Sequence, residues 1–411
     1  MRLRLAVLAC LSGGLLTTTA CTAGHAPVVR TEAATIVVSV PVTAAPWVAR
    51  FATNGAQLAV DELNKGGGLR IGSRRVPFEL KTEDNGGSAQ QAVEIARRAV
   101  KDHALAIITD GTGARAVAAV TDPASLPVFI VFDGDTRLTD AASMPSIFRI
   151  APADKPMATR LADYLAQRKP TVAIISDTTE FGSGGAAALQ VAFARDHIPV
   201  RHSLHVDPSG NSLEGAIGAA RSSGVTALVV WAGSPVVAAA VRAARSSAWN
   251  VAIYAGPTAE DPIVRQLLDD HPSWLDGTTF VSFRITAEVG PAPFAAFRSH
   301  YEKRFGVERV GVSAGARPVT MPPDWAMYGY DCVRLVAAAF ANADGQKGSA
   351  LGQAMNTTVI TGANGDERGF GPTQREGVSP DDMYFGRFQA KRFTPVTDDI
   401  LSTNLPAVEQ G

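Results

Sequence analysis

A glycine-rich turn at residues 111–116 carries the most suggestive chemistry in this sequence. It reads Gly-Thr-Gly-Ala-Arg-Ala, follows an apolar run at 105–109 and opens an Ala-rich stretch. This is the G-x-G-x-x-G/A pattern that holds a dinucleotide pyrophosphate at a helix N-terminus. Asp133 follows the next apolar run, where an acidic residue would meet the ribose. One hypothesis is therefore a dinucleotide-dependent oxidoreductase.

Three observations weigh against a dinucleotide cofactor. The turn follows the third predicted strand rather than the first, and no catalytic His, Tyr or Lys motif accompanies it. A leader for export, described below, would also separate the chain from the cytoplasmic nicotinamide pool. The alternative interpretation is a glycine turn that lets a small ligand approach helix N–H groups. We therefore expect no cofactor.

Other catalytic and metal motifs are missing from the sequence. There is no phosphate-binding loop and no H-E-x-x-H zinc motif. Residues 182–185 are glycine-rich but lack the lysine of a phosphate loop, and they indicate a turn at a helix start. His202 and His205 lie three apart on a predicted strand, so they face opposite sides and cannot share a metal. We expect neither a metal site nor an enzyme.

The amino-acid composition limits the class of protein further. The chain has 411 residues and is 46% hydrophobic, which is enough for two domains with large cores. Lys and Arg number 38 against 39 Asp and Glu, so no basic excess is available to bind nucleic acid. Three cysteines exclude a disulfide scaffold, and Cys332 is most simply a small buried apolar residue.

The N-terminus is typical of a secretory signal. Arg2 and Arg4 precede an apolar run at 5–16. The small residues before Cys21 resemble the lipobox of bacterial lipoproteins, although Thr18 stands where an aliphatic residue is usual. This resemblance implies that residues 1–21 are a signal ending at a lipidated Cys21. Residues 22–34 have no apolar period, which predicts a flexible tether. The alternative is ordinary cleavage near Ala20 or Ala23. We expect an exported protein, lipid-anchored on the outer face of the cytoplasmic membrane or periplasmic.

From residue 35 onward, strand and helix signals alternate. Continuous apolar, β-branched runs predict strands that are buried on both faces. These runs are 36–40, 78–82, 105–109, 128–132, 171–176, 200–206, 227–231, 251–255 and 279–283. A helix is predicted from 52 to 65, ending in three glycines, and another begins at Ser88 with Gln91 three residues on. The alternation predicts an α/β fold with parallel, doubly wound sheets. About ten strand–helix units are too many for one compact sheet, so two lobes are expected.

Several segments, in their order and spacing, resemble the branched-chain amino acid and amide type of substrate-binding protein of ABC importers. They are 54–64 with the glycines at 66–68, 83–84, 126–128, 148–150, 178–182, 330–331 and 365–371. The resemblance implies two Rossmann-like lobes of the type I periplasmic binding protein fold, joined by a three-segment hinge. Lobe 1 would hold 35–150 plus 285–370, and lobe 2 would hold 151–284 plus 371–400.

The resemblance also implies a function and a set of partners. A small polar molecule, such as an amino acid or amide, would bind in the cleft between the lobes and close it. The closed form would be recognised by the permease subunits of an ABC importer, with the chain acting as a monomer. A lipid-anchored ligand sensor with the same fold is an alternative role.

Candidate ligand-binding residues follow from the same resemblance. They are Trp47, Thr112, Gly113, Ala114, Asp133, Gly134, Phe181, Ser234 and Thr258. Only one hydroxyl remains in the turn that would hold a ligand carboxylate, and Asp133 is expected to pair with a ligand ammonium or hydroxyl. Glu260 lies two residues from the position where the family often has an acid. Structural roles are the alternatives: Trp47 packing on the first helix, Asp133 capping its own turn, and Phe181 in the core. Arg115 and Arg137 are expected on the surface.

Overall fold

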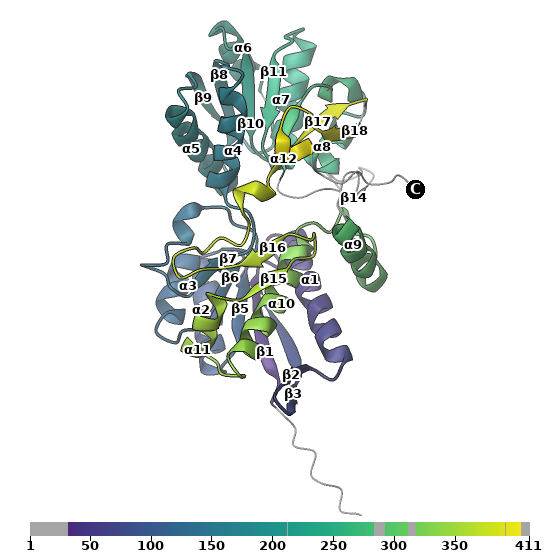
Figure 1. Cartoon of the computed structure of the whole chain (residues 1–411). Coiled ribbons are helices and arrows are strands. Elements are labelled where there is room, and N and C mark those ends of the chain that lie inside the picture. The colour runs from purple at the N-terminus through teal and green to yellow at the C-terminus, as the bar shows by residue number, and fades with distance from the viewer. Residues whose placement is uncertain (1–31, 212, 283–291, 311–317, 391, 404–411) are drawn as a thin grey trace, which may run out of the picture.

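The computed structural model describes residues 32–403 except 212, 283–291, 311–317 and 391. Two sheets define two lobes, which lie one above the other in Figure 1. Lobe 1 contains a five-stranded parallel sheet in the order β4-β1-β5-β6-β7. Lobe 2 contains a seven-stranded sheet in the order β18-β17-β12-β11-β10-β8-β9. The predicted fold class, an α/β protein with two lobes, is confirmed.

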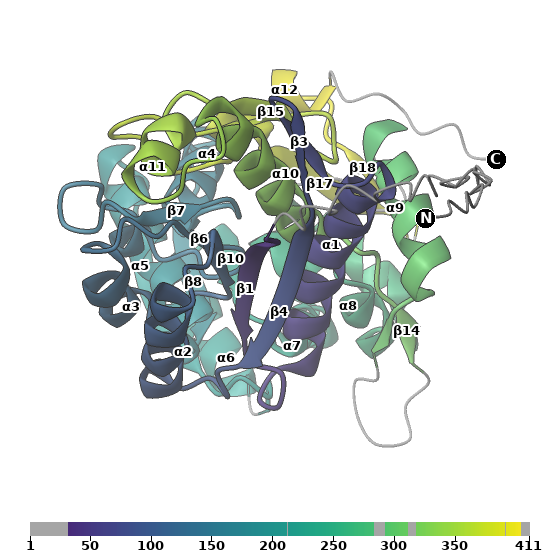
Figure 2. The ribbon, with the colours of Figure 1, turned by 90° about the horizontal axis from the view of Figure 1, so that it is seen from below.

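The lobe 1 sheet is covered by helices on both faces. Its strands are β1 (Ala34–Val40), β4 (Phe78–Asp84), β5 (Ala106–Thr109), β6 (Val128–Ile130) and β7 (Ile147–Arg149). Val37 packs in one apolar cluster with α2 (Ala89–Lys101) and α3 (Ala114–Thr121), whereas Ile36 and Val38 pack in another with α1 (Pro46–Lys65) and α10 (Ala326–Asn342). Figure 2 shows α2 and α3 on one side of β1 and β4 and α1 on the other. Alternate residues of β1 therefore pack into two cores, one on each face of the sheet.

Smaller elements complete lobe 1. Helix α9 (Ala292–Phe305) packs on α1 through Phe297 and Tyr301, and α11 (Ser349–Met355) follows α10. Two hairpins are formed by β2 (Leu69–Ile71) with β3 (Arg74–Val76) and by β15 (Val359–Thr361) with β16 (Glu367–Gly369). Strands β13 (Arg309–Val310) and β14 (Val319–Thr320) pair over two residues, and β14 contacts α8 (Pro262–Leu267) of lobe 2.

Lobe 2 follows the same plan with two antiparallel strands added. Its parallel strands are β8 (Val172–Asp177), β9 (Val200–Val206), β10 (Ala227–Trp231), β11 (Ala252–Ala255) and β12 (Thr279–Ser282). Helices α4 (Asp154–Ala166) and α5 (Glu180–Arg195) join the apolar cluster of one face, and α6 (Glu214–Ser222), α7 (Ser234–Ser246) and α8 (Pro262–Leu267) join that of the other. Strands β17 (Tyr384–Gln389) and β18 (Arg392–Pro395) extend the sheet beyond β12.

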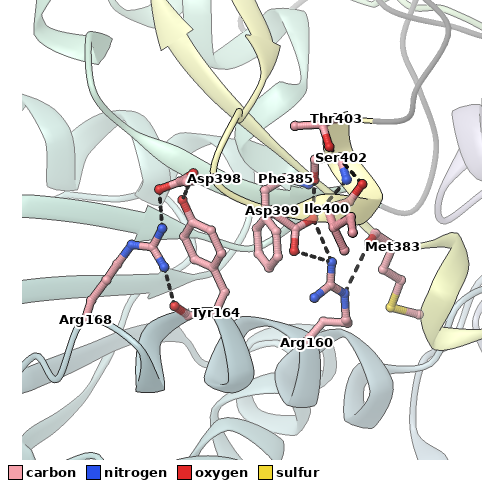
Figure 3. A network of polar contacts seen from close by, with 10 residues as sticks. All are labelled: Arg160, Tyr164, Arg168, Met383, Phe385, Asp398, Asp399, Ile400, Ser402 and Thr403. Atoms are coloured by element: carbon pink, nitrogen blue, oxygen red, sulfur yellow. Dashed lines mark hydrogen bonds and ion pairs between the residues drawn. The ribbon is translucent and has the colours of Figure 1, made fainter.

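The C-terminal part of the chain is fastened to α4 by a polar network, which Figure 3 shows from close by. Arg160 donates from Nη2 to both carboxylate oxygens of Asp399 at 2.9 Å, and Tyr164 donates its hydroxyl to Asp398 at 3.0 Å. Asp399 also accepts from the N–H and hydroxyl of Ser402, in the short helix α12 (Ile400–Thr403). This network joins residues more than 230 positions apart within lobe 2.

Each of the nine predicted runs coincides with a strand, with ends that differ by a few residues. The first helix begins at Pro46 rather than 52, because proline suits the first helical turn and Trp47 through Phe51 continue the pattern. Ser88 caps α2 as predicted, accepting from the Gln91 N–H at 3.4 Å. Cys332 is fully buried, and burial raises the pKa of its thiol.

Other sequence predictions lie outside the described residues. The signal at 1–21, Cys21 and nearly all of the tether at 22–34 precede the described chain. The chain passes from lobe 1 to lobe 2 between β7 and α4, and again between β16 and β17. The expected crossing near residues 284–285 falls in the segment that is not described.

Candidate functional site

A cavity of about 1240 Å³ lies between the two lobes. Its lobe 1 wall consists mainly of the loops that follow β5 and β6, together with the starts of α2 and α3. Its lobe 2 wall consists of the first turns of α4 and α5 and one side of α5. The carboxyl ends of parallel strands are the usual ligand-binding edge of such sheets, so the cavity is the candidate site.

The turn after β5 brings Thr112, Gly113 and Ala114 to the cavity wall. The Thr112 hydroxyl donates to Asp110 Oδ2 at 2.5 Å, and Asp110 also accepts from Asn85 Nδ2 at 2.8 Å. Gly113 has a φ of +66°, and a Cβ there would lie 2.7 Å from the Cα of Ala89. The glycine pattern is thus explained by backbone conformation and close packing of α2.

Asp133 also lines the cavity, in the loop after β6. Its Oδ1 accepts from the Asp135 N–H at 2.8 Å, so the carboxylate shapes its own turn. Its Cβ lies 2.3 Å from the point where Gly111 would carry a Cβ. Burial raises the pKa of Asp133. An acidic side chain packed against Gly111 would repel a pyrophosphate at this turn, which counts against the dinucleotide interpretation.

Two acidic residues of lobe 2 face this loop, and sequence reasoning missed both. Asp154, the first residue of α4, is 4% exposed and lines the cavity. Burial raises its pKa to about 7, although the nearby Arg149 opposes the shift. Glu180 lies in the first turn of α5 and is exposed. The available signal was an acidic residue at a helix start, which is also common for purely structural reasons.

The candidates predicted in the remainder of lobe 2 do not line this cavity. Phe181 packs at 6.1 Å, ring centre to ring centre, on the buried Trp231. Ser234 is 6% exposed and donates to Asp261 at 2.8 Å, whereas Thr258 donates to the Ala232 carbonyl at 2.5 Å. The hydroxyls of Ser234 and Thr258 therefore connect the loops after β10 and β11. Glu260 is buried and accepts from the Ser282 hydroxyl at 2.9 Å.

Trp47 belongs to an aromatic cluster at the edge of lobe 1 and is absent from the cavity wall. Its ring lies 5.6 Å from Phe132 and 6.3 Å from Phe51 of its own helix, both edge to face. Phe132 in turn packs on Trp325 at 4.7 Å. Trp47, Phe132 and Trp325 are each half-buried. Their partial exposure leaves an apolar surface near the carboxyl ends of β1 and β6.

Basic side chains lie at the outer part of the cavity. Arg137 is exposed and pairs with Asp135, whose pKa is lowered by that hydrogen-bonded guanidinium. Arg115 donates to the Arg137 carbonyl at 3.2 Å, and Lys155 is exposed next to Asp154. Gly134 does not line the cavity, but its carbonyl accepts from the Asp154 N–H at 2.9 Å.

The described residues contain neither a metal-binding cluster nor a membrane-spanning helix. Within 32–403, apart from the gaps given above, no three His, Cys, Asp or Glu side chains are grouped so as to hold a metal ion. Over the same residues, none of the helices combines the length and apolar character needed to cross a bilayer.

Comparisons with known proteins agree with this architecture. The fold is similar to a type 1 periplasmic binding protein from Bordetella pertussis, with a TM-score of 0.72, 18% identity, and coverage of 89% of this chain and 100% of that one. It is also similar to an ABC transporter substrate-binding protein from Desulfitobacterium hafniense in complex with Leu (TM-score 0.68, 20% identity, coverage 89% and 100%). A third is a solute-binding protein from Rhodopseudomonas palustris in complex with 3,4-dihydroxybenzoic acid (TM-score 0.69, 17% identity, coverage 87% and 93%).

No curated protein matches the sequence. A family model described as periplasmic binding protein matches residues 43–392, which include the elements of both lobes. The chain therefore belongs to the periplasmic binding protein family.

Proposed function

We propose that the chain is an extracytoplasmic solute-binding lipoprotein that delivers a small polar molecule to an ABC importer. The observation that carries this proposal is the cavity whose walls come from both lobes, at the carboxyl ends of β5 and β6. A ligand there contacts the loops of lobe 1 and the first turns of α4 and α5. Such a ligand favours the closed arrangement because only closure allows both sets of contacts.

The partners and the chemistry follow from family membership. The closed form would be the one that the importer permease recognises, and the chain would act as a monomer without catalysis or cofactor. The division into lobe 1 (35–150 plus 285–370) and lobe 2 (151–284 plus 371–400) belongs to the same proposal. Thr112, Gly113, Ala114 and Asp133 would touch the ligand, while Trp47, Phe181, Ser234 and Thr258 would reach it on closure or support the loops that do.

A thermal-shift screen of the purified full chain tests the binding role. The panel contains amino acids, amino acid amides, amines, sugars, aromatic acids and NAD, and includes the leucine and 3,4-dihydroxybenzoate seen with relatives of this fold. A ligand at one hundred times its Kd stabilises by about 2.7 kcal/mol, which moves Tm by a few degrees. A shift with one small-molecule class supports the proposal. The proposal is contradicted if only NAD shifts Tm, or if none of the compounds does.

Lipid attachment is tested separately. In a bacterial host that exports the chain, radiolabelled palmitate should enter the wild-type protein but not Cys21→Ala. Cys332→Ala is the matched control, because that thiol is buried within lobe 1 and should not affect labelling. Label that persists in Cys21→Ala would contradict the anchor and leave the binding role intact.

A further inference from the structure

The Asp154 carboxylate is in an unusual position for a structural residue. It is 4% exposed, and its Oδ1 has no hydrogen-bond partner among the described residues. A buried acceptor of this kind is costly unless something binds to it, and native proteins leave few such atoms unsatisfied. Asp154 also begins α4, where a negative charge is favourable, but the helix start does not require the side chain to be buried.

Two glycines, one from each lobe, make room for this carboxylate. A Cβ on Gly134, in the loop after β6, would lie 2.5 Å from Asp154 Oδ1. A Cβ on Gly184, in α5, would lie 3.0 Å from Oδ2, and Gly184 lines the cavity. Neither glycine has a positive φ that would itself require glycine. The missing side chains leave room for the carboxylate between the lobes, and on the Gly184 side it is open to the cavity.

The more buried charged groups that line the cavity here are acidic, whereas the basic ones are exposed. Asp133 and Asp154 are these acids, and Asp110 accepts a hydrogen bond from Thr112 just before α3. The buried cation Arg149 lies near Asp154, but it pairs with Glu376 at 3.5 Å, donates to the Asp135 carbonyl at 2.5 Å and does not line the cavity.

The basic residues that do line the cavity are peripheral or already paired. Arg137 is 83% exposed at its side chain and pairs with Asp135, and Arg195 pairs with Asp163 and Asp196. Arg115 and Lys155 are exposed at the rim. A carboxylate brought to the α3 N-terminus would meet Asp110 and Asp133 before it met a free cation, so that helix start is poorly suited to an anion.

We infer that Asp154, together with Asp133, forms a subsite for a protonated nitrogen, so that the captured molecule is an organic cation such as an amine or guanidine. This inference rests on the proposed solute-binding function and specifies its ligand class. A cationic N–H donor at the Asp154 carboxylate would gain charge-assisted hydrogen bonds in a partly dehydrated site. An amino acid would bind more weakly than its amide, which keeps the ammonium group and loses the carboxylate.

The test uses matched probes on the full chain. Benzylamine, benzyl alcohol and benzoate differ mainly in charge, and leucine amide and leucine differ in the carboxylate; putrescine and agmatine extend the series of cations. We expect thermal shifts and calorimetric binding with the cations, with leucine amide at least tenfold tighter than leucine. Asp154→Asn should weaken binding of these cations at least tenfold. Asp163→Asn, which removes the same charge from an exposed position on α4, should change it less than twofold.

Each outcome decides between the proposals. Binding of a nitrogen-free probe that Asp154→Asn leaves unchanged overturns the cation subsite while the solute-binding role stands. Equal losses in Asp154→Asn and Asp163→Asn also overturn it, since general charge would then explain the effect. A panel without any binder contradicts both proposals. Circular dichroism verifies folding, and Asp133→Asn provides the same comparison should Asp154→Asn fail to fold.

Discussion

The backbone N–H of Asp154 donates a 2.9 Å hydrogen bond to the carbonyl oxygen of Gly134. This bond joins the first helix of lobe 2 to the loop that follows β6 in lobe 1. It lies beside the first crossing between the lobes and places the Asp154 carboxylate against the cavity. The proposed cation subsite therefore lies at a direct contact between the two lobes.

Gly134→Ala should weaken ligand binding at least tenfold. The new Cβ would lie 2.5 Å from Asp154 Oδ1 and 2.8 Å from its Cγ, so the carboxylate must move. Isothermal titration with the best ligand of the screen measures the effect. The control is Gly218→Ala in α6, where a Cβ meets nothing within 4 Å. Equal affinities of Gly134→Ala and wild type would show that Asp154 does not contact the ligand.

Asp154→Asn should be more stable than wild type at high pH. Burial raises the pKa of Asp154 in the folded state to about 7. The charge of Arg149 opposes this rise, and those of Asp133 and Asp135 add to it. A carboxyl with a raised folded pKa stabilises the fold when protonated. That stabilisation is complete below the ordinary pKa of 3.8 and is lost as pH rises through about 7.

Urea unfolding at pH 4.5 and pH 8 measures this pH dependence. The stability difference between Asp154→Asn and wild type should grow with pH by at least about 1 kcal/mol, since one pKa unit corresponds to about 1.4 kcal/mol. Asp163→Asn, on the exposed face of the same helix, is the matched control for removing a carboxylate from α4. A constant difference for Asp154→Asn would mean that its carboxyl titrates normally.

Gly55→Ala should destabilise lobe 1 by about 1–3 kcal/mol, the usual cost of overpacking. Helices α1 and α10 cross so closely that a Cβ on Gly55 would lie 1.8 Å from the Ala326 carbonyl oxygen. Gly352→Ala in α11 has nothing within 4 Å and should be neutral or stabilising. Tm values from calorimetry make the comparison, and a Gly55→Ala variant as stable as Gly352→Ala would contradict the close crossing.

Arg160→Met should cost about 2–4 kcal/mol, because it leaves Asp399 without its buried cation. The two side chains are only 13% and 10% exposed. Burial opposes ionisation of Asp399, but hydrogen bonds from Ser402 and Arg160 outweigh it and lower its pKa. Arg97→Met, which breaks an exposed pair with Glu94, should cost less than about 1 kcal/mol. Chemical denaturation distinguishes them, and equal costs would mean that the network in Figure 3 adds little stability.

Local sequence patterns were enough to predict the repeating elements. The run ending at Thr109 and the glycines after it predict a buried strand and a turn, because every residue involved lies within one short segment. The cap of α2 by Ser88 was predicted for the same reason. Short pieces were missed: β7 has three residues, and its pairing with β6 depends on neighbours far from it in sequence.

The candidate site was only partly predictable. Thr112 and Asp133 follow directly from the strand ends, and they line the cavity. Ser234 and Thr258 also follow strands, but their hydroxyls bond to neighbouring loops, a distinction that no local pattern contains.

By itself, the sequence determined the α/β class, the two lobes and the strand ends whose loops line the cavity. Those features arise from the periodicity of apolar residues and from turn chemistry, which act over a few residues. The tertiary structure alone decided that Asp154 is a buried carboxylate open to the cavity. Its surroundings come from Gly134 in one lobe and Gly184 in the other, and the burial of a charge depends on which distant segments fold around it.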